Sequence, residues 1–333
     1  MNPMLGPLRR FALTLAIAWV VLAAAGIVYA RVLDLPARLA APIVAAFLWE
    51  ASLYLALAFA EVRAAVEQRW RPSLVGAGLA ASAVLPYLVY ALPTGTFHWT
   101  SAAILAALAV VAAFWFLMLP RNPFWDAAFV VLMAAVVLGK LFSRIYLSPV
   151  PGVHLEILGQ LAWTRLGIWI ILSFRRQEGI GFGFIPVRAE WLSGIRQYLY
   201  FLPLGLPLGL VSGVLRFQPV QMEWWKAAGL AAGTFLGILW VVALAEEFFF
   251  RGLLQQWFSN WLHSRTAGLI LASVAFGLVH LPFRGFPNWG FALIATIAGV
   301  FYGRAYFQSG SIRAAMVTHA LVVTTMRVFF APG

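Results

Sequence analysis

The sequence predicts an all-α protein, a polytopic bundle of transmembrane helices. Of its 333 residues, 63% are hydrophobic and only 10% are charged, and the mean hydropathy is +0.90. Apolar runs such as residues 11–30 and 101–119 reach about 20 residues, which as helix crosses the ~30 Å hydrocarbon core of a bilayer. A soluble domain cannot be built from this composition.

Apolar windows along the chain place about eleven spans. The first follows Arg9 and Arg10 as in a signal peptide, but its apolar run is too long and its end is a poor cleavage site, so we expect a retained span. The expected spans are residues 11–30, 39–60, 73–92, 99–119, 124–142, 154–174, 197–215, 227–249, 266–281, 289–307 and 311–330.

The charge balance is strongly basic, with 23 Lys+Arg against 11 Asp+Glu and a formal charge of +12. The basic residues lie mostly between apolar spans, so the expected partner is a bilayer with anionic headgroups and not a nucleic acid. Loops on the side of the N-terminus hold more arginines, which predicts an N-terminus inside. Arginine outnumbers lysine 21 to 2, which favours a bacterial cytoplasmic (inner) membrane.

The longest polar stretch divides the chain. Residues 1–174 are expected to form a six-span region, and residues 175–195 a basic linker with an interfacial helix, because Gly and Pro punctuate an amphipathic piece. Residues 196–333 form the C-terminal core. In this core, glycines repeat every four residues, a spacing that lets membrane helices approach closely, at Gly205, Gly209, Gly213, Gly229, Gly233 and Gly237.

Three ionisable residues interrupt an apolar span in the stretch ALAEEFFFRG, residues 243–252. A charge at the centre of a membrane helix costs about 2.5–3.5 kcal/mol, so Glu246, Glu247 and Arg251 must be compensated or functional. Glu247 and Arg251 are i,i+4 neighbours and can pair. Glu246 points about 140° away from Arg251 on the helix, which leaves it free to act as a general base.

Two histidines lie in the spans that follow these glutamates. From the turn near residue 264, Glu246 and His280 are each roughly 25 Å away at 1.5 Å per residue, so they share a depth. His319 is roughly 14 Å from the turn near residue 310. The difference closes if residues 250–263 continue as helix beyond the membrane, as their polar content allows.

The residues EEFFFR (246–251), FGLVH (276–280) and HALVV (from His319) resemble the EExxxR, FxxxH and HxxxN motifs of the CPBP (Abi) family. This family contains the CAAX-processing and bacteriocin-processing intramembrane endopeptidases, and the resemblance covers about residues 196–330. It implies that Glu246 and His280 activate water against a peptide bond. Glu247 and Arg251 would brace the site, His319 would stabilise the oxyanion, and Phe276 would pack beside His280.

One position departs from the family pattern, because Val323 stands where the family has Asn. That Asn helps to hold the oxyanion, a kind of contribution worth about 2.7–4 kcal/mol. Thr324, Thr325 or Asn288 could substitute for it, and the sequence does not choose among them. The departure also keeps open a catalytically inactive member that serves as a membrane scaffold.

Other protease chemistries are excluded. The chain has no cysteine and no HExxH helix, and its two aspartates, Asp34 and Asp126, lie at span edges. No cofactor is expected, although Glu246, His280 and His319 would also suit a divalent metal such as zinc. The resulting interpretation is a glutamate-dependent endopeptidase that cleaves a membrane-anchored peptide or protein. The alternative is a transporter that uses the same charges, although no inverted repeat supports it.

Charges also fall within the N-terminal spans. Glu50 lies in the second expected span, and Glu156 and Arg165 in the sixth. We expect them to pair across helices. The alternative is that they line a path for the substrate.

Overall fold

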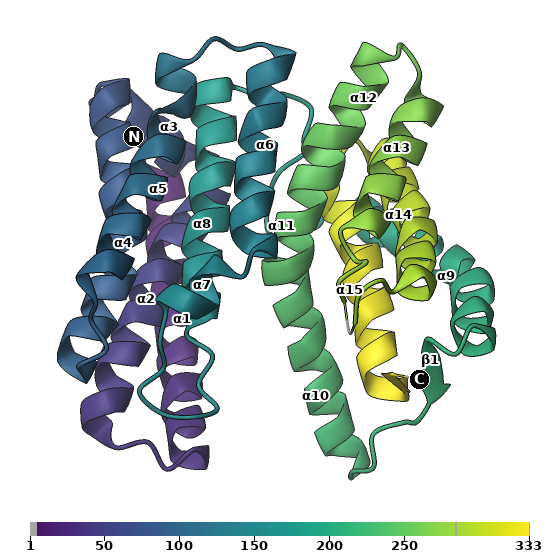
Figure 1. Cartoon of the computed structure of the whole chain (residues 1–333), viewed down its shortest axis with the longest axis horizontal. Coiled ribbons are helices and arrows are strands. Elements are labelled where there is room, and N and C mark those ends of the chain that lie inside the picture. Colours follow the sequence, from purple (N-terminus) through teal and green to yellow (C-terminus); the bar gives the residue numbers. More distant parts are fainter. Residues whose placement is uncertain (1–4, 284, 333) are drawn as a thin grey trace. The chain divides into compact units, whose positions relative to one another are not determined.

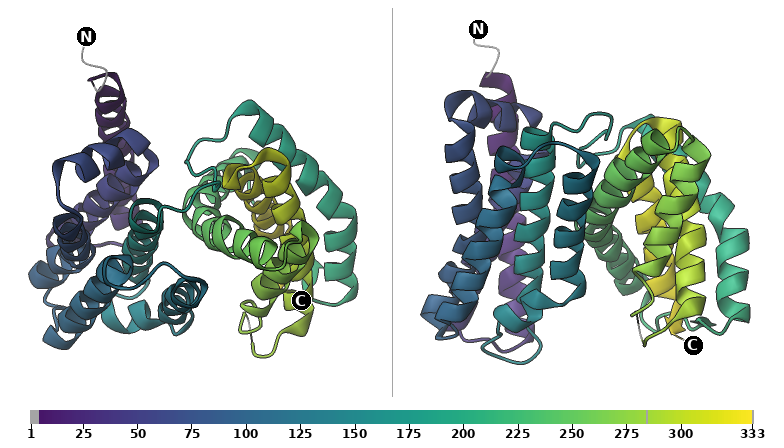
Figure 2. Two further views of the ribbon diagram at one scale, coloured as in Figure 1. Left: turned by 90° about the horizontal axis from the view of Figure 1, so that it is seen from above. Right: turned by 45° about the horizontal axis from the view of Figure 1, so that its top comes forward.

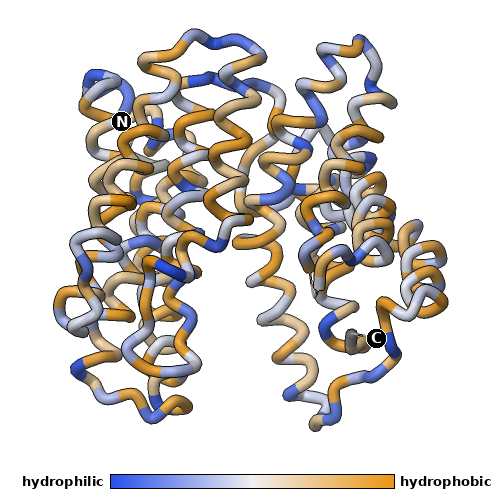
Figure 3. Tube along the Cα trace, viewed as in Figure 1, coloured by the Kyte–Doolittle hydropathy of each residue, from blue (hydrophilic) through white to orange (hydrophobic). Residues whose placement is uncertain are grey.

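The computed structural model describes residues 5–283 and 285–332, which form two compact units, Met1–Gln177 and Glu178–Gly333. Among the described residues the regular secondary structure is helical apart from one short pair of strands. Figure 3 shows mostly hydrophobic helices with hydrophilic residues concentrated at their ends. The protein is therefore an integral membrane protein built of α-helices.

Eight helices among the described residues are long and apolar enough to cross a membrane. The expected number of about eleven spans was too high, because two of the apolar helices are short and a third helix is charged. Pro123–Leu138 and Arg265–Leu278 are apolar but have only 16 and 14 residues, which is about 24 and 21 Å of helix. The helix Arg188–Val211 carries Arg188, Glu190 and Arg196 in its first half and is not among the eight.

The unit Met1–Gln177 consists of helices that run side by side (Figures 1 and 2). The helices are α1 (Leu5–Val32), α2 (Ala37–Ala58), α3 (Ala60–Arg69), α4 (Pro72–Thr94), α5 (Trp99–Met118), α6 (Pro123–Leu138), α7 (Leu141–Ile145) and α8 (Glu156–Ile170), which the π-helical turn η1 (Ile171–Arg175) extends. Helices α2, α4 and α5 all pack against α8, which is therefore the centre of this unit.

A fully buried ion pair joins α2 to α8. Arg165 Nε donates to Glu50 Oε1 over 2.7 Å and Nη2 donates to Oε2 over 3.2 Å, and both side chains are 0% exposed. Arg165 Nη1 also donates to Ser82 Oγ of α4 over 3.0 Å. The predicted pairing of Glu50 with Arg165 is confirmed, whereas Glu156 pairs with His154 at 2.9 Å.

Breaking this pair on one side is expected to destabilise the unit. Arg165→Met leaves Glu50 buried and unpaired, which costs about 3–5 kcal/mol, whereas Glu50→Gln/Arg165→Met removes both charges and should regain most of that loss. Thermal unfolding in detergent measures both effects. The control is Glu61→Gln, whose side chain is 41% exposed and pairs with the 72% exposed Arg10; this change should shift stability by at most about 1 kcal/mol. A single variant as stable as the wild type would contradict the expectation.

The unit Glu178–Gly333 is built around one long continuous helix and α15. The long helix comprises α10 (Trp224–Gly237), η2 (Ile238–Ala243), α11 (Leu244–Glu247), η3 (Phe248–Gln255) and α12 (Gln256–Trp261). Its 38 residues extend about 57 Å, well beyond the ~30 Å of a hydrocarbon core. The expected continuation of residues 250–263 as helix is therefore confirmed to Trp261.

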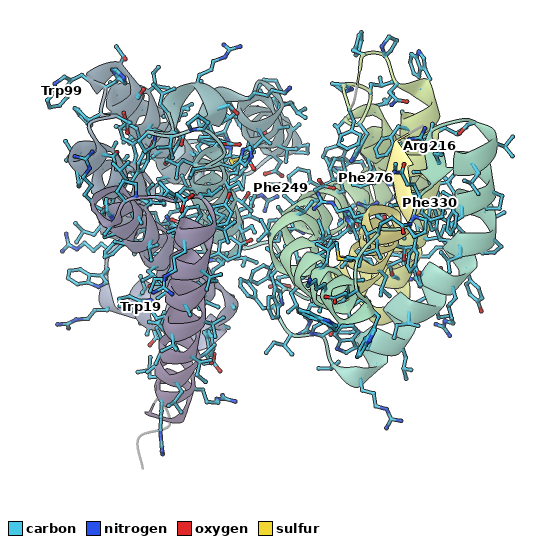
Figure 4. The ribbon with its side chains drawn as sticks, turned by 90° about the horizontal axis from the view of Figure 1, so that it is seen from below. Trp19, Trp99, Arg216, Phe249, Phe276 and Phe330 are labelled. Atoms are coloured by element: carbon cyan, nitrogen blue, oxygen red, sulfur yellow. The ribbon has the colours of Figure 1, made fainter. Side chains whose placement is uncertain are left out.

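The remaining elements of this unit are α9 (Arg188–Val211), β1 (Leu215–Phe217), α13 (Arg265–Leu278), α14 (Trp289–Ser309), α15 (Ile312–Phe329) and β2 (Phe330–Pro332). Helix α15 lies among α9, α14 and the long helix (Figure 2). Strands β1 and β2 pair antiparallel with Arg216 opposite Ala331, and Figure 4 shows Arg216 and Phe330 at this ladder. The ladder fixes the end of α15 to the segment between α9 and α10.

Close helix approach occurs at glycines other than those in the predicted stripes. A Cβ built on Gly229, Gly233 or Gly237 meets nothing within 4 Å, so the expectation of close packing at these positions of α10 is wrong. On α14, a Cβ at Gly299 would lie 3.1 Å from Arg251 Nη2, and one at Gly303 would overlap with Gln255 Oε1. Glycine at these two positions therefore lets polar side chains of η3 reach the backbone of α14.

Candidate active site

The two glutamates lie in the short α-helical segment α11, between the π-helical segments η2 and η3. Wide turns of this kind inside α-helices are frequent at functional sites, because they change the direction in which side chains point. Glu247 is 0% exposed, and the side chain of Glu246 is 30% exposed. The two adjacent carboxylates therefore have different surroundings.

Arg251 holds Glu247 inside the helices, as their i,i+4 spacing predicts. Its Nη1 donates to Glu247 Oε1 over 3.3 Å, and its Nε lies 3.1 Å from Oε2 without hydrogen-bond alignment. Nη2 donates to the carbonyl oxygen of Gly299 over 3.1 Å. The guanidinium also lies over three rings, 4.5 Å from the centroid of Phe276, 5.2 Å from that of Tyr302 and 5.7 Å from that of Phe250. Hydrogen bonds, opposite charge and ring faces together compensate this buried cation.

His319 of α15 connects the two glutamates. Its Nδ1 lies 2.7 Å from Glu247 Oε1, and its Nε2 lies 3.9 Å from Glu246 Oε2. Because a carboxylate only accepts, Nδ1 carries the proton, and a neutral imidazole then presents an unprotonated Nε2 toward Glu246. The imidazole stacks on Tyr302 with centroids 4.7 Å apart and meets Phe276 edge-on at 5.8 Å. Its orientation is therefore fixed on several sides.

Glu246 is the less engaged of the two carboxylates. Its Oε2 is buried and has no hydrogen-bond partner among the described residues. The distance of 3.9 Å to His319 Nε2 is too long for a direct hydrogen bond, but two polar atoms at this separation can both bond to one water molecule. The expectation that one glutamate is paired and the other is left free agrees with this geometry.

His280 lies just beyond the end of α13, in the turn that follows the helix. Its Nδ1 donates to the carbonyl oxygen of Phe276 over 2.7 Å, so Nε2 is again the free nitrogen. The ring of Phe276 is 4.7 Å from that of His280 and 5.8 Å from that of His319, and Figure 4 shows Phe276 among the helices of this unit. No ion pair joins His280 to Glu246 in the described part of the chain, where the imidazole in contact with Glu246 is that of His319.

The helix that carries His319 offers no obvious replacement for the missing Asn. Val323 is one turn after His319, about 40° around the helix, whereas Thr324 points about 140° away. Thr324 Oγ1 is buried and has no hydrogen-bond partner among the described residues, and Thr325 Oγ1 lies 2.7 Å from the hydroxyl of Tyr198. Neither threonine therefore shares the face of α15 that bears His319.

Asn288 is occupied at the start of α14. Its Oδ1 accepts from the backbone nitrogen of Phe291 over 2.9 Å, and its Nδ2 donates to the carbonyl oxygen of Phe283 over 3.1 Å. These are the contacts of a helix N-cap, so the side chain already serves the fold.

The described residues do not provide a set of ligands for a metal ion. No group of three or more His, Cys, Asp or Glu side chains in these ranges is arranged to hold a metal ion. Glu246, His280 and His319, the residues considered for zinc, do not form such a group.

Two further residues contribute to this site but are not found by searching the sequence for charged residues and histidines. Tyr302 supplies the ring that stacks on His319, and Gly299 supplies a carbonyl to Arg251. Both lie on α14, outside the three matched motifs. The sequence signal for them is the pair of glycines at 299 and 303 with an aromatic residue between, a pattern common in membrane helices.

Comparison with known families matches part of this unit. Residues 228–325 match the family model described as Rce1-like, type II CAAX prenyl endopeptidase Rce1-like. The matched range contains the five residues singled out in the sequence, Glu246, Glu247, Arg251, His280 and His319. The comparisons with curated proteins and with solved structures gave no match.

Proposed function

We propose, from the premise that the C-terminal region of this chain contains an Rce1-like domain of the type II CAAX prenyl endopeptidase family, that the chain is an intramembrane glutamic endopeptidase. The observation that carries the proposal is the arrangement around His319. One of its nitrogens bonds to the buried Glu247 at 2.7 Å, and the other faces Glu246 at 3.9 Å. Such an arrangement fits the activation of one water molecule.

The chemistry follows from which atoms can accept protons. A water between Glu246 and His319 would donate one hydrogen to Glu246 Oε2 and the other to His319 Nε2, which directs its lone pairs away from both. Attack on a peptide carbonyl forms a C–O bond and breaks an O–H bond, and Glu246 takes that proton. The proton then passes to the leaving nitrogen as the C–N bond breaks. Glu246 is thus the general base and afterwards the general acid.

Glu247 and Arg251 would act as positioning residues. The carboxylate of Glu247 holds the proton of His319 on Nδ1, so the acceptor nitrogen stays on the side of Glu246. Arg251 balances the charge of Glu247 where water cannot, because both side chains are 0% exposed. The proposal differs from the roles implied by the family resemblance, since His319 partners Glu246 here.

The depth of the site favours a substrate cleaved near one membrane surface. Glu246 is 22 residues after Trp224, or about 33 Å along the helix, and 15 residues before Trp261, or about 22 Å. If the exposed Trp224 and Trp225 mark one interface and the exposed Trp261 marks the other, the helix leans, and Glu246 lies in the half of the membrane nearer to Trp261. The substrate would be a membrane-anchored protein cut in that half of the bilayer, on the side that the positive-inside rule assigns to the cytoplasm.

Restoring the family residue at position 323 is expected to raise activity. An Asn one turn after His319 adds a donor on the same helix face, and single oxyanion donors contribute about 10²–10³ in turnover, so Val323→Asn should speed cleavage by up to about 10²-fold. Initial rates with one peptide substrate measure this, with Val323→Leu as the control for size. A rate that Asn leaves unchanged would mean that position 323 does not face the reacting carbonyl.

Val323 also favours a second candidate function. Without an oxyanion donor at this position, the domain could bind membrane proteins without cutting them. The binding surface and the fold would be the same in both cases, so only the appearance of a new peptide end separates the two.

The proposal is tested by comparing peptide termini. Cells that express the wild type, Glu246→Gln or no protein are compared by mass spectrometry of the N- and C-termini of their membrane proteins. New termini that appear with the wild type alone support an endopeptidase. Stable capture of the same proteins by wild type and variant, with no new termini, supports the scaffold. Ion flux in proteoliposomes that depends on Glu246, again without new termini, supports a transporter.

A further inference from the structure

A cavity of about 360 Å³ lies at the end of the unit Glu178–Gly333 where α12, α13 and α14 meet. It is lined by the end of α12, the turn that follows it and the last residues of α14, and its side chains include Gln256, Ser259, Asn260, His263, Arg265 and Tyr306. The cavity is separate from the candidate active site, because it begins ten residues, or about 15 Å, beyond Glu246 on the long helix.

The lining offers donors and positive charge. Arg265 has no ion-pair or hydrogen-bond partner in the described part of the chain, and its guanidinium lies 5.8 Å from the ring centroid of Phe307. The side chains of Asn260 and His263 are likewise exposed and without a partner there. No carboxylate is among the lining residues that the structure describes. An arginine, an imidazole and an amide without a competing acid form a site for an anion.

Hydrogen bonds between its lining residues hold the other side of the cavity in place. Gln256 Nε2 donates to the Tyr306 hydroxyl over 2.6 Å, and that hydroxyl donates to the carbonyl oxygen of Gly179 over 2.8 Å. These bonds join α12, α14 and the segment that precedes α9. The cavity therefore keeps its shape without a ligand, which lowers the cost of binding one.

The surroundings of the cavity point to a lipid. Trp261 and Leu262 are 42% and 51% exposed, and both lie in the chain directly before the lining residue His263. Exposed Trp and Leu at the end of a membrane helix are typical of the layer between headgroups and acyl chains. A cavity of this volume accommodates a headgroup, since pockets for small ligands begin at about 300 Å³.

We propose that this cavity binds the phosphate group of an anionic phospholipid, with Arg265 and His263 as the anion-binding residues. The acyl chains would lie against Trp261 and Leu262. The inference concerns binding alone, so its test needs no peptidase activity. Inorganic phosphate shares the recognised chemistry and serves as the competing source of the anion.

The test measures lipid binding to the full-length protein in detergent. Phosphatidylglycerol or phosphatidylcholine is titrated into the wild type, and binding is followed by native mass spectrometry and by the thermal midpoint. Phosphatidylglycerol should bind at least tenfold more tightly than phosphatidylcholine. Inorganic phosphate should compete at high concentration without raising the midpoint to the same extent.

Variants locate the site. Arg265→Gln/His263→Asn should lower the affinity for phosphatidylglycerol about tenfold or more, and Asn is chosen because residue 263 has a φ of 48°, which Asn tolerates. Arg304→Gln is the matched control, an exposed arginine of α14 that does not line the cavity. The midpoint without lipid shows whether each variant is folded. Equal affinity in the double variant and the wild type overturns the proposal, and phosphate that binds as tightly as the lipid overturns the choice of a lipid.

Discussion

Replacing Glu246 with Gln is expected to lower peptide hydrolysis by about 10²–10⁴-fold, the usual contribution of a general base. The amide has nearly the shape of the carboxylate but cannot accept a proton from water. Because Glu246 is 30% exposed and its ion-pair contact in the part of the chain that the structure describes is the 3.9 Å one to His319, the variant should fold as the wild type does. Cleavage of one peptide by the purified proteins in proteoliposomes measures the loss.

A matched control uses the glutamate directly before the same long helix. Glu223 precedes α10 and forms an exposed pair with Lys226 at 2.7 Å, far along the chain from the site. Glu223→Gln should keep the wild-type rate. If Glu246→Gln also kept it, while thermal unfolding showed both variants folded, Glu246 would not be the base and the proposed mechanism would fail.

Replacing Arg251 with Met is expected to have the largest effect on stability in this unit. The change leaves Glu247 buried with His319 as its one remaining partner, and breaking a buried pair costs about 3–5 kcal/mol. At about 2–4 °C per kcal/mol for a unit of this size, the thermal midpoint should fall by at least about 6 °C. Thermal unfolding in detergent, followed by tryptophan fluorescence, measures the shift.

The double variant distinguishes an unpaired charge from lost packing. Glu247→Gln/Arg251→Met removes both charges and should recover a large part of the midpoint, because the amide can still accept from His319. It should not recover hydrolysis, since Gln holds the imidazole less firmly than a carboxylate does. A double variant less stable than Arg251→Met would show that Arg251 acts mainly through its contacts with Phe276 and Tyr302.

Spacing along one helix was enough to predict the pairing inside the site. Glu247 and Arg251 are four residues apart, and they form the expected ion pair even though the intervening turns are π-helical. Rise per residue also predicted that Glu246 and His319 share a depth, which their distance of 3.9 Å supports. These predictions need only local geometry.

The choice of histidine could not be predicted in this way. Which imidazole faces Glu246 depends on the rotation of α13 and α15, and packing against neighbours sets that rotation. Helix α13 ends at Leu278, so His280 lies in a turn that runs up to Pro282, whereas the apolar pattern alone extended the expected span to residue 281. The ring of Phe276 between the two histidines is likewise a product of tertiary packing.

The number of spans was misjudged for a related reason. Apolar composition marks residues 124–142 and 266–281 as spans, but the helices there are only 16 and 14 residues long. Composition does not show where the backbone leaves the helix, because apolar residues continue past both helix ends, at Leu141 and Phe142 after α6 and at Val279 and Leu281 after α13. The same limit explains why Tyr302 and Gly299 were not singled out.

The length of the helix from Trp224 to Trp261 makes the protein sensitive to the thickness of its bilayer. A rod of about 57 Å cannot match a hydrocarbon layer of ~30 Å, so it must lean or project, and both change with the acyl chains around it. Because Glu246 is built into this rod, thinner and thicker membranes would carry its carboxylate to different heights relative to the lipid surface. Hydrophobic mismatch would thus decide which bond of an anchored substrate comes level with the water-activating groups.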